Sequence, residues 1–322
     1  MKEKRILGID IGGTNFRIGA VNAEGEARLF RKIPVREVFR TEDALMDLLA
    51  CIEGYLAELG EEIAAVSIGF PATLNRERSR VLQAPNLPFV ENLPVVLTLS
   101  ERLGVPVFIE RDVTMTLCYD VVKYGIPRQG ITCGFYFGTG IGNAISVNGL
   151  PLIGKNGAAG ELGHIPVDGS EEACGCGNIG CMENLAGGKY LARLRENIYP
   201  ETPIGELFSA HGSEAELTQF VDRMAMAVAT EINILDPDHV LIGGGVPAMK
   251  DFPTGLLHER ILTHVRKPFP AQELEILYTS DIEEKGVVGA AWYANSKLNL
   301  QHKVSGVIRT TVFPGWNPLI LR

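Results

Sequence analysis

The chain has 322 residues, and its 30 lysines and arginines against 39 aspartates and glutamates give a formal net charge of -9. Such an acidic chain repels nucleic-acid and anionic lipid phosphates, which argues against nucleic acids and membrane surfaces as partners. A hydrophobic content of 46% with 21% charged residues excludes a disordered chain. At roughly 100–200 residues per domain, the length favours two domains.

Three further features of the sequence indicate where the protein is located. Residues 1–5 lead straight into a short apolar strand, without the long apolar region and cleavage site of a secretory signal. The most apolar later stretch, residues 131–153, is interrupted by glycines and asparagines and is unsuited to span a membrane. Six cysteines are too few for a disulfide scaffold. We therefore expect a soluble, cytoplasmic protein.

Hydrophobic periodicity predicts an α/β chain. The expected strands cover residues 5–11, 16–21, 27–33, 64–70, 105–110, 132–137, 143–147, 239–242 and 274–278. The expected helices cover residues 41–59, 94–103, 113–124, 213–235, 254–267 and 286–298. Thr41 is the expected N-cap of the first helix, and Ser213 with Glu216 matches the capping-box pattern at the start of the fourth.

One segment resembles another within the chain. Residues 9–25 and 132–149 each contain a strand, a turn of glycine and threonine, a second strand, and an asparagine followed by a glycine turn. This similarity suggests two like-folded halves. Any glycine-rich β-hairpin would give the same pattern, so the sequence leaves both interpretations open.

Three glycine-rich turns are candidate nucleotide-binding elements. A turn of consecutive glycines exposes backbone N–H groups that can cradle phosphate, although Gly-Gly is also an ordinary hairpin turn. Asp10 would repel a phosphate unless Mg²⁺ lay between them, which implies a magnesium–nucleotide complex. A triple-glycine turn after a strand suits close approach by a flat base, although by itself an ordinary turn at the end of a strand is the simpler interpretation. The candidate residues are Asp10, Gly12, Gly13, Thr14, Asn15, Gly138, Thr139, Gly140, Gly142, Gly244 and Gly245.

A cysteine-rich segment has the composition of a zinc site. His164 is followed after nine residues by Cys174, and Cys176 and Cys181 complete the set. One imidazole and three thiolates close a tetrahedral Zn²⁺ site and leave no position open for a substrate. Disulfide pairing is disfavoured, because Cys174 and Cys176 lie too close in sequence and three thiols leave one unpaired. The pattern therefore predicts a structural Zn²⁺.

A carboxylate at a strand–helix junction is the candidate general base. Asp112 follows Glu110 and Arg111 where a predicted strand ends and a helix begins. In a cleft, such a carboxylate can accept a proton from a hydroxyl. From its position alone, an N-cap role for Asp112 is the simpler interpretation.

Taken together, these motifs resemble the ROK family of sugar kinases and sugar-responsive repressors. The resemblance extends over about residues 5–300 and rests on Gly8–Thr14, Arg111-Asp112, Gly138–Gly142, Gly160–His164 and the Cys174–Cys181 cluster with Glu183. It implies the actin-like, hexokinase-type α/β fold, a duplicated ribonuclease H-like architecture of two domains with a central cleft for Mg-ATP and sugar. It also implies a homodimer, by analogy with other members.

The resemblance assigns roles to individual residues. Asp112 matches the catalytic base, and Gly244-Gly245 the adenosine site. The expected sugar-binding residues are Asn86, Arg111, Asp112, Glu161, His164 and Glu183. The implied domains are residues 1–112 with about 287–303, and residues 113–286 with the zinc loop, while 304–322 form a tail of no assigned role.

Arg111 is a departure from the family pattern, which usually has asparagine there. Arginine donates hydrogen bonds but accepts none, so a different pattern of sugar hydroxyls is implied. Arg111–Val113, Phe70–Ala72 and Ala84–Pro88 together resemble the D-allose kinase branch. Glucokinase, fructokinase and N-acetylmannosamine kinase are the alternatives within the family. A sugar-responsive regulator is disfavoured, because the phosphate motif starts at Gly8 and leaves no room for a preceding helix-turn-helix.

Overall fold

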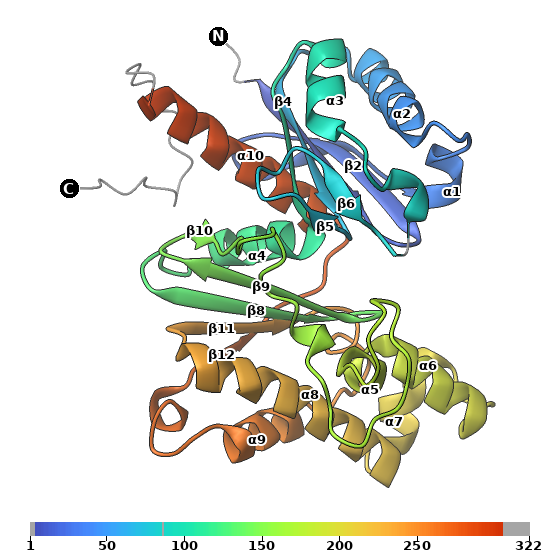
Figure 1. Ribbon diagram of the computed structural model, residues 1–322, viewed down its shortest axis with the longest axis vertical. Helices are drawn as coiled ribbons and strands as arrows, with labels where there is room; N and C mark the ends of the chain where they lie inside the picture. Colours follow the sequence, from blue (N-terminus) through green and yellow to red (C-terminus); the bar gives the residue numbers. More distant parts are fainter. Residues whose placement is uncertain (1–3, 86, 305–322) are drawn as a thin grey trace. The chain divides into compact units, whose positions relative to one another are not determined.

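The computed structural model describes residues 4–85 and 87–304, and its chain divides into two units (Figure 1). The first unit contains Met1–Ile126, Ile153–Ala158 and Ile282–Arg322, and the second contains Pro127–Leu152 and Ala159–Asp281. The family resemblance implied a boundary after residue 112. The helix that follows residue 112 instead belongs to the first unit, because it packs against the unit's C-terminal helix. The predicted tail was residues 304–322; Val304 ends the C-terminal helix, and residues 305–322 lie outside the described residues.

The first unit is built on a five-stranded sheet with the order β3-β2-β1-β4-β7. Its strands are β1 (Arg5–Ile11), β2 (Asn15–Val21), β3 (Ala27–Pro34), β4 (Ile63–Phe70) and β7 (Val107–Arg111). The first three strands are antiparallel neighbours, whereas β1, β4 and β7 run parallel. A small hairpin, β5 (Thr73–Leu74) with β6 (Val81–Gln83), follows β4 and was not predicted.

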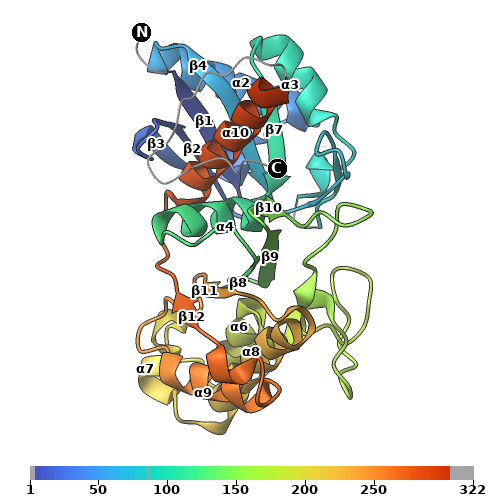
Figure 2. The same cartoon turned by 90° about the vertical axis from the view of Figure 1, so that its left-hand side faces the viewer.

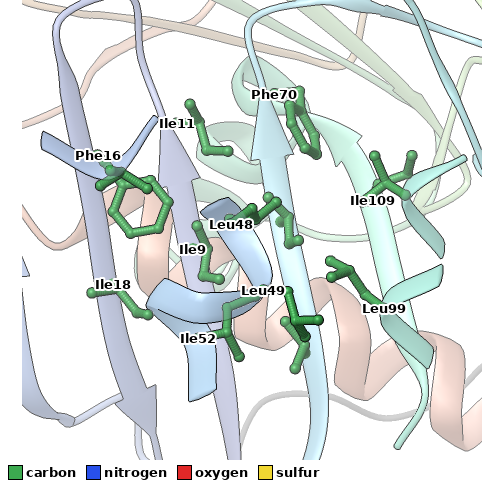
Figure 3. Packing of buried hydrophobic residues seen from close by; sticks show 14 of the residues in the cluster. Ile9, Ile11, Phe16, Ile18, Leu48, Leu49, Ile52, Phe70, Leu99 and Ile109 are labelled. Carbon is green, nitrogen blue, oxygen red and sulfur yellow. The ribbon is translucent and has the colours of Figure 1, made fainter. Parts of the chain in front are cut away.

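Helices cover both faces of this sheet. They are α1 (Val35–Val38), α2 (Ala44–Leu59), α3 (Val95–Leu103), α4 (Asp112–Lys123) and α10 (Lys285–Val304), with a 3₁₀ turn at Pro88–Val90. Helices α2 and α3 cover one face, and α10 with α4 covers the other (Figures 1 and 2). Because strand side chains alternate, Ile9 and Ile11 of β1 point toward α2 (Figure 3), while Gly8 and Asp10 face α10.

Gly8 permits a close approach of α10 to the sheet. A Cβ atom at Gly8 would lie 2.1 Å from the backbone oxygen of Val287. We expect Gly8→Ala to lower the free energy of unfolding by about 1–3 kcal/mol, the usual cost of overpacking. The matched control is Gly54→Ala in the exposed middle of α2, where a Cβ would meet nothing within 4 Å. That change should stabilise by about 0.5–1 kcal/mol. Denaturant unfolding of both variants checks whether the free energy of unfolding falls in Gly8→Ala and rises in Gly54→Ala.

The second unit repeats the sheet of the first. Its order is β10-β9-β8-β11-β12, with β8 and β9 antiparallel and β8, β11 and β12 parallel. The strands are β8 (Ile131–Phe137), β9 (Ile141–Val147), β10 (Leu150–Pro151), β11 (His239–Gly243) and β12 (Ile276–Tyr278). In each unit a β-hairpin starts the sheet and two parallel strands extend it. The internal similarity in the sequence therefore reflects two like-folded halves.

The helices of the second unit complete its core. They are α5 (Glu183–Ala186), α6 (Gly188–Asn197), α7 (Leu207–His211), α8 (Ala215–Leu235) and α9 (Thr254–His264), with short 3₁₀ turns at Leu162–His164, Ile204–Glu206 and Ala271–Glu273. Helices α8 and α9 pack together on one face of the sheet (Figures 1 and 2). Within the described residues, every helix is too short or too polar to cross a bilayer.

Two predicted helix caps were wrong. Helix α2 begins at Ala44, and the side chain of Asp43 rather than Thr41 accepts the hydrogen bond from the N–H of Met46. Thr41 instead donates its own N–H to Asp47. At α8 the N-cap is Glu214, so Ser213 does not start a capping box. The carboxylate of Glu214 accepts a hydrogen bond from Tyr199, a partner distant in sequence.

Candidate functional site

The first glycine turn joins β1 to β2. The N–H of Gly12 donates to the carbonyl of Asn15 over 2.8 Å, which closes a tight turn, and Gly13 and Thr14 are exposed at its tip. The carbonyl of Thr14 accepts from Val35 at the start of α1. The turn is thus fixed at both ends, while its tip presents backbone to solvent.

Asp10 lies beside this turn and has a partner that the sequence analysis missed. Antiparallel pairing places Asp10 opposite Arg17, whose Nη1 lies 3.1 Å from Oδ2 of the aspartate. The first turn of α10 closes over the same carboxylate, since a Cβ at Gly286 would lie 2.5 Å from its Cγ. Burial raises the pKa of Asp10, and the charge of Arg17 opposes that rise. Counting residues across the hairpin would have identified Arg17.

Asp112 is the first residue of α4 and follows the end of β7. The N-cap position belongs to Arg111, so the N-cap interpretation of Asp112 was wrong. One oxygen of Asp112 accepts from the N–H of Val113 at 2.8 Å. Gly69 near the end of β4 allows Asp112 to lie close to that strand, because a Cβ at Gly69 would lie 3.3 Å from the Cα of Asp112. Asn86, the other sugar-binding candidate predicted in this unit, lies outside the described residues.

The second glycine turn joins β8 to β9, and residues of α5 and α6 form hydrogen bonds with it. The carbonyl of Gly138 accepts from Gly188 at 2.8 Å, and that of Thr139 accepts from Lys189 at 3.0 Å. Oε2 of Glu183 accepts from the N–H of Ile141 at 3.0 Å. A Cβ at Gly140 would lie 2.0 Å from that same oxygen. The structure thus joins Glu183, predicted to bind sugar, to a turn predicted to bind phosphate.

The third glycine turn has a structural explanation in part. Gly244 has a φ of +100°, and a Cβ there would lie 2.5 Å from the carbonyl oxygen of Phe137 in β8. Its lack of a side chain therefore allows contact between strands. At Gly245 the nearest atom to a Cβ is Oδ2 of Asp281, at 4.0 Å. Gly245 thus has the room for a ligand that Gly244 lacks.

The predicted zinc ligands come together in the second unit. The ligand atoms of His164, Cys174, Cys176 and Cys181 all lie within 4.8 Å of one another. Sγ of Cys174 is 3.6 Å from Nδ1 of His164, and the sulfurs of Cys176 and Cys181 are 3.7 Å apart. One imidazole and three thiols at these separations suit a tetrahedral Zn²⁺.

His164 links the cysteine cluster to a candidate sugar-binding residue. Its Nδ1 faces Cys174, while its Nε2 lies 3.6 Å from Oε2 of Glu161. The intervening 3₁₀ turn brings the two side chains to one side, because the N–H of His164 donates to the carbonyl of Glu161. An ion bound by the cluster would therefore fix the imidazole that contacts Glu161.

Comparisons with known proteins agree with this arrangement. The chain is 28% identical over 314 residues to a glucokinase of Thermotoga maritima, covering 90% of this chain and 97% of the relative. It is 30% identical over 278 residues to an N-acetyl-D-glucosamine kinase of Escherichia coli O127:H6, covering 80% and 89%. The crystal structure of a ROK hexokinase from Thermus thermophilus superposes with a TM-score of 0.71 at 27% identity, covering 91% and 99%. The actin-like, hexokinase-type fold is thus confirmed. The model of the ROK family matches residues 6–297, and the chain belongs to that family.

Proposed function

We propose that this protein is an ATP-dependent sugar kinase that phosphorylates the 6-hydroxyl of D-allose. Membership of the ROK family and the two relatives named as sugar kinases support the kinase activity. The observation that carries the reaction is the carboxylate of Asp112 at the first residue of α4, directly after the strand that the motif predicts. Following the family resemblance, we further propose that the chain acts as a homodimer.

Asp112 acts as the general base in this proposal. It accepts the proton of the sugar hydroxyl while the hydroxyl oxygen forms a bond to the γ-phosphorus of ATP. The bond between the γ-phosphorus and the β,γ-bridging oxygen breaks, and ADP leaves with that electron pair. The hydrogen bond from the N–H of Val113 to one oxygen of Asp112 orients the carboxylate at the start of α4.

The two glycine turns bind the phosphates. In the β8–β9 turn the N–H of Gly138 donates to Gly140 and that of Ile141 to Glu183, so a phosphate would meet the amides of Thr139 and Gly140. A carboxylate is a ligand that Mg²⁺ prefers, and Asp10 offers one beside the β1–β2 turn. When bound there, Mg²⁺ supplies charge neutralisation for the phosphates. Arg17 holds the Asp10 side chain in place for this role.

The sugar-binding residues of the proposal follow the family resemblance. Glu161, His164 and Glu183 contact hydroxyls, and Arg111 beside the base replaces the asparagine usual in the family. The clustered ligands His164, Cys174, Cys176 and Cys181 hold a structural Zn²⁺. With four protein ligands the ion takes no part in the chemistry, and its role is to fix the imidazole of His164.

A panel of hexoses tests the substrate. We expect sugar-dependent ADP release with Mg-ATP, and a higher kcat/KM for D-allose than for D-glucose, D-fructose, N-acetylmannosamine or N-acetylglucosamine. Arg111→Asn should lower the preference for D-allose over D-glucose by about 10- to 100-fold, the worth of one hydrogen bond to a charged group. A panel without turnover would refute the kinase. Preference for another hexose in the wild type would refute only D-allose.

A further inference from the structure

Arg78 occupies a buried position in the first unit that the proposed reaction does not yet use. It lies in the turn between β5 and β6 and has a φ of +53°, a left-handed conformation that side chains with a Cβ rarely adopt. Its side chain is only 9% exposed. A buried charged side chain on a strained turn needs a compensating set of contacts.

The contacts of Arg78 reach three segments of chain. Nη1 donates to the carbonyl of Gly157 at 3.0 Å and, at 3.3 Å, to the carbonyls of Leu74 and Asn75 in its own hairpin. Nε lies 2.8 Å from Oε1 of Glu110. These two atoms are not aligned for a hydrogen bond, so the attraction is that of an ion pair. The planar fork of arginine allows all these contacts at once.

Glu110 connects Arg78 to β7, the strand that ends directly before the proposed catalytic base. Its side chain is fully buried, and Oε1 accepts from the N–H of Arg111 at 2.9 Å. Oε2 accepts from the hydroxyl of Tyr293 in α10 at 3.2 Å. The carboxylate therefore holds the peptide between Glu110 and Arg111, one residue before the peptide that joins Asp112 to the strand. The ion pair with Arg78 fixes that carboxylate against the hairpin.

Gly157, the other partner of Arg78, packs closely against the β5–β6 hairpin. It has a φ of +80°, and a Cβ there would lie 2.2 Å from the carbonyl oxygen of Leu74. Gly157 belongs to residues 153–158, which are part of the first unit although β10 before them and Glu161 after them belong to the second. The chain from Gly157 to Glu161 is only four residues long. One guanidinium thus holds both the strand that leads to Asp112 and the segment that leads to Glu161.

We propose that Arg78 is a positioning residue for sugar phosphorylation, which ties residues 153–158, the segment that leads to Glu161, to β7, the strand that leads to Asp112. The inference rests on the proposed function, because it takes both residues as parts of the sugar site. Loss of the tie loosens the sugar relative to the base. The glycine turns that bind the nucleotide make no contact with Arg78 in the described residues, so ATP binding is unaffected.

Arg78→Lys tests the inference with the least disturbance. Lysine keeps the charge beside Glu110, but its single ammonium cannot span all the carbonyls that the guanidinium reaches. We expect kcat/KM for the sugar to fall about 10- to 100-fold, mostly through KM, as for a small misplacement of a reacting group. KM for ATP should stay within about twofold of the wild type. The sugar Kd, measured by calorimetry without ATP, should rise with KM.

Arg80→Lys is the matched control. Arg80 is an exposed residue of the same hairpin, and its guanidinium donates to the carbonyl of Asn92. It contacts neither Glu110 nor residues 153–158 in the described structure, so the kinetics of this variant should equal those of the wild type. A purely structural role of Arg78 would instead lower the melting temperature and leave both KM values unchanged.

Gly157→Ala provides a second route to the same tie. The added Cβ would lie 2.2 Å from the carbonyl oxygen of Leu74 and 2.8 Å from Nη1 of Arg78. It should therefore undock residues 153–158 without removing the guanidinium, and the same rise in sugar Kd is expected. Wild-type sugar Kd in both Arg78→Lys and Gly157→Ala would overturn the inference and leave the kinase standing. A wild type without sugar-dependent ADP release would overturn the proposed function, and this inference with it.

Discussion

Replacing Asp112 by asparagine is expected to lower kcat by about 10²- to 10⁴-fold, the usual contribution of a general base. Asparagine keeps the shape of the side chain and can still accept from the N–H of Val113. It cannot take the proton of the sugar hydroxyl at neutral pH. Sugar Kd by calorimetry should therefore change little, while the rate of ADP release collapses.

The matched control for this loss is Asp43→Asn. Asp43 caps α2 through a hydrogen bond from Met46, and asparagine caps helices about as well as aspartate. The same chemical change at this exposed position should leave kcat unchanged. Turnover of Asp112→Asn close to that of the wild type would place the base elsewhere.

Removal of one predicted zinc ligand should lower both the stability of the protein and its sugar turnover. We expect one Zn²⁺ per chain in the purified protein and its loss in Cys174→Ser. Structural zinc sites have apparent binding free energies of about 10–16 kcal/mol, which is comparable to the stability of a whole domain, about 5–15 kcal/mol. The variant should therefore melt the loop between His164 and Cys181, lower the unfolding midpoint and abolish sugar turnover. Elemental analysis and thermal unfolding measure these changes.

Cys51→Ser separates loss of the metal from loss of a cysteine. Cys51 is a half-buried thiol in α2, far along the chain from the cluster and in the other unit. Its variant should keep the full zinc content. If the wild type contained no zinc and Cys174→Ser melted at the same temperature, the four side chains would be an unmetallated cluster.

Local patterns were sufficient to predict most strands and helices. Strand β1 places apolar side chains at alternate positions Leu7, Ile9 and Ile11, and the glycine turn after it is followed by a second apolar strand pattern. Helix caps were less predictable, because several neighbouring polar residues compete for one N–H. At α2 both Thr41 and Asp43 qualify by type, and the backbone path decided for Asp43. At α8 a distant tyrosine engages Glu214, which no local pattern encodes.

Local sequence patterns were enough to identify the groups of the candidate sites: the acidic residues beside glycine turns, the four side chains of the predicted zinc site and the ROK motifs. The residues that those groups contact could be found only from the packing of the fold. Several of these contacts join neighbouring strands or segments distant in sequence: Arg17 with Asp10, Glu183 with Gly140, and Arg78 with Glu110 and Gly157. Such contacts depend on how sheets and helices pack, because a side chain's period fixes its face of an element but not the neighbour that covers it.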